Sequence, residues 1–110
     1  MYELLITVQC RGCGHLFDAH VDLEKLDFEV FDAYERQMGY ERDYDDTCEI
    51  ECPKCGTFGF LAFAIYEYPL GFCEHCDITS SDYTFDVILY DFKELRTFCD
   101  DYLSEYRGQY

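Results

Sequence analysis

The sequence predicts a single α+β domain in which two amphipathic helices pack on a small antiparallel sheet. Three observations support this fold class. The chain has 110 residues, a length that suits one domain. Hydrophobic residues make up 49% of it and aromatic residues 19%, so a globular core is expected in place of disorder. Runs with the composition of strands are separated by two stretches that have the apolar spacing of helices.

The N-terminal part is expected to hold two strands and the first helix. Residues 2–9 and 16–22 have the composition of strands, and the second run alternates between apolar and polar side chains. Residues 23–38 place apolar side chains at helical spacing. Gly39 suits the position that follows a helix, so we expect the helix to end there.

The middle of the chain is expected to form a loop and two strands. Residues 40–47 are acidic and are expected to be a loop, which leads into a short strand at residues 47–52. Residues 58–68 are apolar on both faces of a strand, which is typical of a central position in a sheet. The Pro-Leu-Gly segment at residues 69–71 ends that strand.

The C-terminal part predicts one more strand, at residues 84–91, and the second helix, at residues 93–107. Asp91 and Glu94 have the spacing of an N-terminal helix cap, and Gly108 is expected to end the helix.

Acidic residues outnumber basic residues by 24 to 8, which gives a formal net charge of −16. Because a field of that sign repels phosphate, attraction to DNA or RNA is excluded as the main source of affinity. No apolar run reaches the length of about 18 residues that a membrane-spanning helix needs. The first ten residues lack the basic segment of a secretory signal, so we expect a cytoplasmic protein.

Cysteine is the strongest chemical feature, because six of the eight cysteines form three Cys-x-x-Cys pairs. Eight cysteines in a secreted chain would suggest four disulfides, but no export signal precedes these. Two thiolates separated by two residues can face one point from a tight turn, which suits an ion with four tetrahedral ligands. A glycine follows two of the pairs and permits the left-handed backbone that such a turn needs. We therefore expect a bound metal and a reducing compartment.

The preferred ligand set combines the first two pairs, Cys10, Cys13, Cys52 and Cys55. An alternative set joins the second pair to Cys73 and Cys76, since the spacing between these pairs fits a common single-zinc pattern. Distance favours the first set, because a strand over residues 58–68 carries the chain about 35 Å away from the second pair. His15 follows the first pair and is expected to lie near the ion or at the surface without binding the ion.

Three interpretations of Cys73 and Cys76 stay open. The two residues hold a second ion together with Cys99, His75 or a partner subunit, or they form a redox-active dithiol, or they are ordinary thiols in a surface turn. Cys48 and Cys99 fall on apolar faces, where a free cysteine is expected to act as a small hydrophobe.

The segments V-Q-C-R-G-C-G at residues 8–14 and I-E-C-P-K-C-G at residues 50–56 resemble the two knuckles of a zinc ribbon. In that family each knuckle is the tip of a β-hairpin, and the ion joins the two hairpins. The resemblance implies a structural Zn²⁺ in one ribbon-containing domain over residues 1–110, and it implies no particular function. The two pairs also resemble rubredoxin, an iron electron carrier, which makes iron the alternative ion. The third pair and the long segment between the first two pairs depart from rubredoxin.

Four thiolates leave no open position for water, so hydrolysis at the metal is not expected. The sequence contains no recognisable motif of a Ser-His-Asp catalytic triad and no glycine-rich phosphate-binding loop. It therefore predicts a protein without enzymatic activity.

Negative charge is concentrated in residues 24–51, where 11 acidic and 3 basic side chains give a net charge of −8. Tyrosines lie among these acids, which is typical of a surface that buries area and attracts a basic partner. The candidate contact residues are Tyr34, Glu35, Tyr40, Glu41, Asp43, Tyr44, Asp45 and Asp46.

We therefore expect a zinc-binding interaction module for a basic protein, acting as an inhibitor, an immunity or antitoxin-type protein, or a DNA mimic. One alternative is electron transfer or dithiol redox chemistry at the cysteines. A second alternative is a nucleic-acid-binding ribbon, which would require more basic residues than the knuckles carry.

Overall fold

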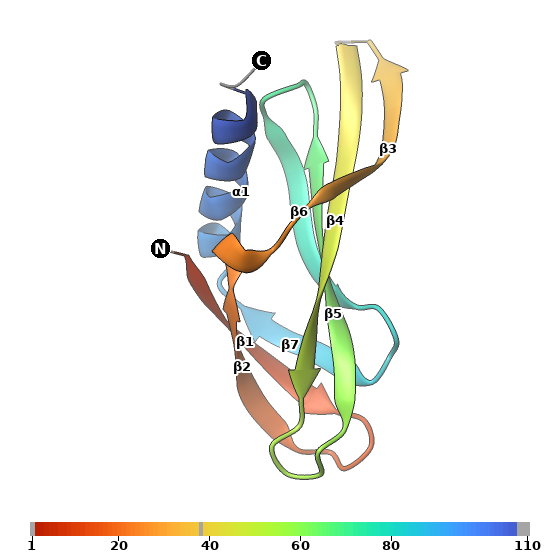
Figure 1. Ribbon diagram of the computed structural model, residues 1–110, viewed down its shortest axis with the longest axis vertical. Helices are drawn as coiled ribbons and strands as arrows, with labels where there is room; N and C mark the ends of the chain where they lie inside the picture. Colours follow the sequence, from red (N-terminus) through yellow and green to blue (C-terminus); the bar gives the residue numbers. More distant parts are fainter. Residues whose placement is uncertain (1, 38, 108–110) are drawn as a thin grey trace.

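The computed structural model describes residues 2–37 and 39–107 and shows two antiparallel sheets and a C-terminal helix (Figure 1). In chain order the elements are β1 (Glu3–Cys10), β2 (Leu16–Asp22), the 3-10 turn η1 (Leu23–Lys25), β3 (Glu29–Arg36), β4 (Gly39–Glu51), β5 (Phe58–Glu67), β6 (Cys73–Ser80), β7 (Phe85–Tyr90) and α1 (Phe92–Arg107). One sheet has the strand order β2-β1-β7, and the other has the order β3-β4-β5-β6. The fold is mostly β, and the described residues contain one α-helix where the sequence predicts two.

The predicted helix over residues 23–38 is wrong. η1 makes one short turn at its start, and β3 follows as an outer strand of the four-stranded sheet. Apolar residues at helical spacing stabilise a helix when they reach a core, but all eight residues of β3 are exposed. β3 has one β-branched residue, Val30, and two aromatic residues, Phe31 and Tyr34, which favour strands, and pairing with β4 fixes that conformation. Gly39 has φ +113° at the β3–β4 turn in place of ending a helix, and Met38 lies outside the described residues.

The expected acidic loop at residues 40–47 is also wrong. These residues belong to β4, which continues through the predicted strand at residues 47–52 as far as Glu51. β4 pairs with β5 over the whole length from Arg42 to Glu51. Because β4 carries charged side chains on both faces, its sequence lacks the alternation of apolar and polar residues that is typical of a strand. Pairing with the apolar β5 stabilises the strand conformation in spite of this composition.

Other elements follow the sequence closely. β5 lies between β4 and β6, as expected for a central strand. α1 buries Leu95, Phe98 and Leu103 against the sheets. The backbone N–H of Glu94 donates to Asp91 Oδ1 at 3.1 Å, which confirms the predicted cap. Gly108, expected to end the helix, lies outside the described residues.

The core lies between the two sheets and beneath α1. Its most deeply buried apolar side chains include Leu4, Ile6, Val8, Leu61, Phe63, Ile65, Phe85, Leu95 and Leu103. β5 approaches β7 so closely that Gly59 is required at the contact, since a Cβ there would lie 2.7 Å from the Phe85 ring. Only one face of the long apolar run of β5 is fully buried: Leu61, Phe63 and Ile65 point into the core, whereas Phe58 and Phe60 on the other face are exposed.

The molecule is elongated, with extents of 46 × 27 × 19 Å. The β1–β2 and β4–β5 turns lie together at its lower end in Figure 1, and the β3–β4 turn lies at the upper end. β5 runs between the two ends, so the cysteine pairs before and after it are far apart. None of the described helices has the length and apolar character needed to cross a membrane.

Candidate metal centres

The first two cysteine pairs lie in two turns with the same backbone structure. In each turn the N–H of the glycine donates to the carbonyl of the first cysteine, at 2.7 Å for Gly14 and Cys10 and at 2.9 Å for Gly56 and Cys52. Both glycines have φ +76°, in the left-handed region that glycine adopts without strain. Each turn ends a β-hairpin, β1–β2 or β4–β5, as the resemblance to a zinc ribbon implies.

The four sulfurs of these turns are placed as one tetrahedral ion would require. The Sγ atoms of Cys10 and Cys55 are 3.7 Å apart, those of Cys13 and Cys52 are 3.6 Å apart, and all four lie within 4.8 Å of one another. An ion at about 2.3 Å from each sulfur separates the sulfurs by about 3.8 Å. Cys10 and Cys52 are buried, while Cys13 and Cys55 are exposed. The four-Cys group can therefore bind a metal ion such as zinc.

The electrostatics of this group favour a bound cation. Hydrogen bonds from the side chain and the backbone of Thr57 lower the pKa of Cys55 to about 6. The backbone N–H of His15 acts in the same direction on Cys13, but partial desolvation and the hydrogen bonds with the neighbouring thiols raise its pKa to about 11. Four close sulfurs cannot all be anionic without a positive charge among them, so binding of a cation would release protons.

Within residues 2–37 and 39–107, the surroundings of the four-Cys group supply no further ligand. His15 stacks on Phe17 with ring centroids 5.9 Å apart and does not belong to the group. Arg11 lies between the first two cysteines in sequence and pairs with Asp86 at 2.7 Å. The alternative ligand set with Cys73 and Cys76 is wrong, because these residues lie at the other end of β5.

The third pair belongs to a different group. Cys73, Cys76 and Cys99 offer sulfurs that lie within 4.8 Å of one another, and all three residues are buried. The pair lies in β6 and not in a surface turn. The sequence predicts Cys99 to be a packing residue of the core, with a role beside this pair as one of several alternatives. The position of Cys99 on the apolar face of α1 is the sequence feature that could have indicated a contact with the buried pair.

His75 cannot join this group, because it lies on the opposite face of β6. It pairs in register with Tyr66, stacks on that ring with centroids 5.7 Å apart, and approaches Asp77 Oδ2 at 3.4 Å. Cys48 is half-buried, with its sulfur 3.7 Å from the carbonyl oxygen of Glu49, and belongs to neither group. The expectation that Cys48 is a packing residue fits this position.

The candidate partner-binding residues divide into exposed and internal ones. Tyr34, Glu35, Tyr40 and Asp45 are exposed. Glu41 and Asp43 are buried on the outer face of β4. Tyr44 points to the other face, where its hydroxyl donates to Glu67 at 2.7 Å. Asp46 accepts the backbone N–H of Asp27 at 2.8 Å.

Glu41 is held by a cluster of polar and aromatic side chains. It accepts from the Tyr34 hydroxyl and from Arg36 Nη1, both at 2.5 Å. The Arg36 guanidinium lies 3.8 Å from the centroid of the Tyr68 ring and reaches Glu74 at 3.4 Å. The Tyr34 bond is the first cause of a lowered pKa at Glu41. This cluster explains how a charged side chain is buried there.

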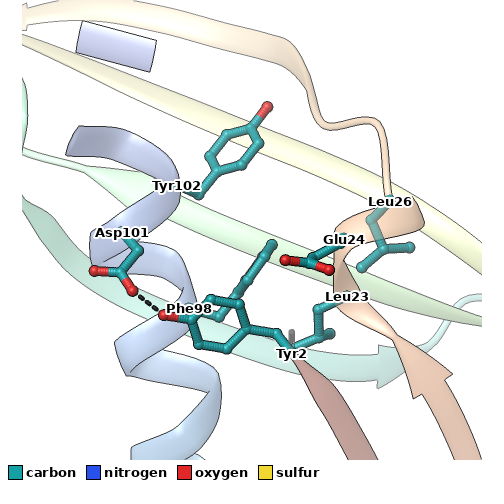
Figure 2. A pocket seen from close by; sticks show the side chains of 7 residues that line it. All are labelled: Tyr2, Leu23, Glu24, Leu26, Phe98, Asp101 and Tyr102. Carbon is teal, nitrogen blue, oxygen red and sulfur yellow. Dashed lines mark hydrogen bonds between the residues drawn. The ribbon is translucent and has the colours of Figure 1, made fainter. Parts of the chain in front are cut away.

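A pocket of about 360 Å³ lies between β1, η1 and α1 (Figure 2). Its lining contains two acidic and two tyrosine side chains in an otherwise apolar wall, and the Tyr2 hydroxyl donates to Asp101. None of its lining residues is a cysteine, although Phe98 is the chain neighbour of Cys99.

Comparison of the chain with protein-family models, curated proteins and solved structures gave no match.

Proposed function

We propose that this protein is a zinc-stabilised interaction module of the cytoplasm, which binds a basic protein through the β3–β4 hairpin and carries no enzymatic activity. The observation that carries the proposal is the exposure of every residue of β3 on an outer strand that combines acidic with apolar side chains. An inhibitor, an immunity or antitoxin-type protein, or a DNA mimic would use such a surface.

The four-Cys group supports a structural use of the ion. Four thiolates fill the tetrahedron of Zn²⁺ and leave no position for a substrate or a water molecule. The two turns that they join belong to different sheets, so an ion there stabilises the contact between those sheets. Such a closed site contributes free energy to folding, on the order of 10 kcal/mol in zinc-finger peptides.

The hairpin surface consists of the exposed residues of β3 together with Tyr40 and Asp45 of β4. Phe31 is 55% exposed, Tyr40 53% and Val30 49%, which are high values for large apolar side chains. Glu29, Asp32 and Glu35 lie among them on β3. The aromatic residues supply the surface area that a partner would bury. The acidic residues attract a basic partner to this surface and repel acidic proteins.

Binding can be tested with the full chain as bait, followed by affinity measurements on a purified captured protein. We expect a basic partner whose affinity falls steeply between 50 and 300 mM salt, because salt screens the attraction between exposed charges. Tyr40→Ala should weaken binding about 10- to 30-fold, and Glu35→Lys should reduce the association rate.

Two variants serve as matched controls. Tyr83→Ala removes another highly exposed tyrosine, and Asp100→Lys makes the same change of charge on α1 as Glu35→Lys makes on β3. Both should leave the affinity unchanged. Binding that ignores salt, or that responds equally to the hairpin and control variants, would refute the proposed surface.

The identity of the ion separates the proposed structural role from electron transfer. A colourless protein with one zinc ion in the four-Cys group supports the structural role. A coloured protein with iron in that group and reversible one-electron reduction would favour the rubredoxin-like alternative.

A further inference from the structure

A bulge in β6 brings Cys73 and Cys76 to the same face of the sheet. Residues three apart in a regular strand point to opposite faces. Here Glu67 pairs with Cys73, and the adjacent Tyr66 pairs with His75. Glu74 is therefore an extra, unpaired residue in β6, and it places the side chains of Cys73 and Cys76 on the same face of the sheet. Bulges of this kind re-aim side chains, and this one directs a second thiol into the core.

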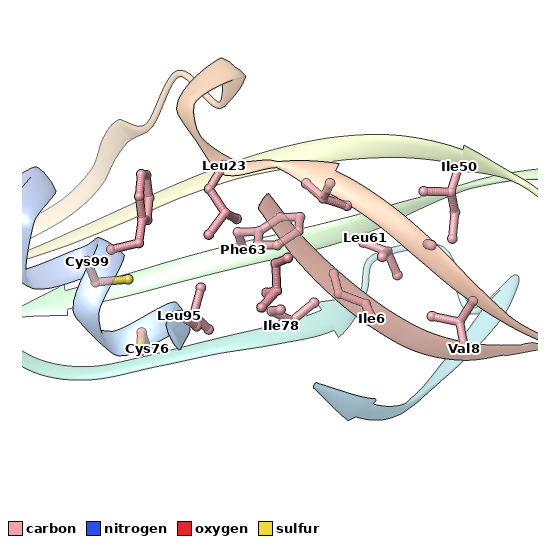
Figure 3. Packing of buried hydrophobic residues seen from close by; sticks show 14 of the residues in the cluster. Ile6, Val8, Leu23, Ile50, Leu61, Phe63, Cys76, Ile78, Leu95 and Cys99 are labelled. Carbon is pink, nitrogen blue, oxygen red and sulfur yellow. The ribbon is translucent and has the colours of Figure 1, made fainter. Parts of the chain in front are cut away.

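Cys99 of α1 completes a three-sulfur group from the opposite side. It lies on the buried face of the helix together with Leu95, and Figure 3 shows Cys76 and Cys99 at the end of the core where α1 covers β6. All three cysteines have 0% exposure. Arg96, the neighbour of Leu95, donates from Nη2 to the Cys73 carbonyl at 2.6 Å and brings a positive charge to the group.

The size of the group fits one ion. Three sulfurs at about 2.3 Å from a central ion in a plane lie about 4.0 Å apart, and the observed separations are within 4.8 Å. An iron–sulfur cluster places its cysteine sulfurs around several iron atoms and needs a wider spacing.

A fourth protein ligand is absent from this group in the part of the chain that the structure describes. Glu67 is buried beside Cys73, but Tyr44 and the Gly71 N–H occupy its two carboxylate oxygens at 2.7 and 2.6 Å. His75 lies on the other face of β6. Structural zinc sites have four ligands, whereas soft thiolates without a fourth donor suit Cu(I).

We propose that Cys73, Cys76 and Cys99 form a second, buried metal site that binds one three-coordinate thiophilic ion of the Cu(I) class and fastens α1 to β6. The site is independent of the proposed partner and of the four-Cys group, with which it shares no residue.

The test uses the reduced full chain loaded with one zinc ion and titrated anaerobically with Cu(I) in the presence of a Cu(I) chelator. Native mass spectrometry should show one zinc and one copper ion per chain. X-ray absorption at the copper edge should show three sulfur neighbours. Cys99→Val, which keeps an apolar side chain of similar size, should bind no copper at the same chelator concentration and should retain its zinc.

Cys48→Val is the matched control, because Cys48 belongs to neither cysteine group. It should bind copper as the unmodified chain does. The X-ray absorption measurement needs no variant, so the proposal is also testable if Cys99→Val fails to fold. Absence of copper binding, displacement of zinc by copper, or a second zinc ion that occupies the group in place of copper would overturn the assignment.

Discussion

Glu41 and Asp43 are buried side by side on the same face of β4, with 4% and 6% exposure, and their pKa values shift in opposite directions. Glu41 has strong donors in Tyr34 and Arg36, whereas Asp43 Oδ1 has no hydrogen-bond partner among the described residues. Burial, followed by the neighbouring Glu41, raises the pKa of Asp43 to about 7. One carboxylate is thus stabilised as an anion while its neighbour holds a proton.

The Asp43 proton makes stability depend on pH. With an unfolded pKa of about 3.9, Asp43 is deprotonated in the unfolded chain but protonated in the native chain between about pH 4 and 7. Its stabilising contribution is therefore full below about pH 4 and is lost as the pH rises through 7. Glu41, with a lowered pKa, has the opposite dependence: its contribution is present above its unfolded pKa and is lost in acid.

Asp43→Asn should therefore be more stable than the unmodified chain at pH 8, by about 1–3 kcal/mol, and the gain should be clearly smaller at pH 5, where only part of the pH-dependent loss has occurred. The Asn side chain stays neutral at both values of pH. Urea unfolding at the two pH values measures the difference. Asp45→Asn makes the same change at an exposed position of the same strand and should have no such effect. An equal gain in stability at pH 5 and pH 8 would contradict the explanation that burial beside Glu41 raises the pKa of Asp43.

Arg36 should be important for stability because it neutralises a buried carboxylate. Arg36→Met removes three interactions, the ion pairs with Glu41 and Glu74 and the contact with the Tyr68 ring, and should lower the melting temperature. Arg36→Lys keeps the charge but loses the planar stacking, so it should recover part of that loss. Thermal unfolding compares the three proteins, and an Arg36→Lys variant no better than Arg36→Met would show that charge is unimportant here.

Gly14 and Gly59 should respond to alanine for different reasons. Gly14→Ala meets no atom within 4 Å but has φ +76°, so the cost of about 1–2 kcal/mol lies in the backbone. Gly59→Ala would bring a Cβ within 2.7 Å of Phe85, and we expect a comparable or larger loss from overpacking. Gly14→Asn should recover stability because Asn tolerates the left-handed region. Gly59→Asn should not, and melting temperatures of the four variants distinguish the two causes.

Removal of the ion from the four-Cys group should destabilise the whole domain. A chelator, or Cys52→Ser, should lower the melting temperature by more than 10 °C, which corresponds to roughly 2 kcal/mol or more in a domain of this size. Cys48→Ser serves as the control, since that thiol is outside both groups. A chelator that releases no metal, or a Cys52→Ser variant that melts like the control, would contradict the metal-centred interpretation of the fold.

The sequence predicted the features that depend on local geometry. Cys-x-x-Cys-Gly fixes a turn within five residues, and the Asp91–Glu94 cap depends on one hydrogen bond within a helix turn. β3 was not predicted, because its exposed residues form a strand only through pairing with β4. The spacing of residues within β3 carries no sign of that pairing. The meeting of Cys73 with Cys99 depends on the extra residue Glu74 in β6 and on the docking of α1, two features set by tertiary structure.

The arrangement of the three-stranded sheet has a consequence for biosynthesis. β1 is the middle strand of that sheet, and its Ile6 pairs with Tyr90 of β7, so one side of β1 stays unpaired until β7 has left the ribosome. All four cysteines of the first group emerge much earlier, by residue 55. Metal capture by the nascent chain would thus tie its two hairpins together and restrain the open strand from pairing with other chains during translation.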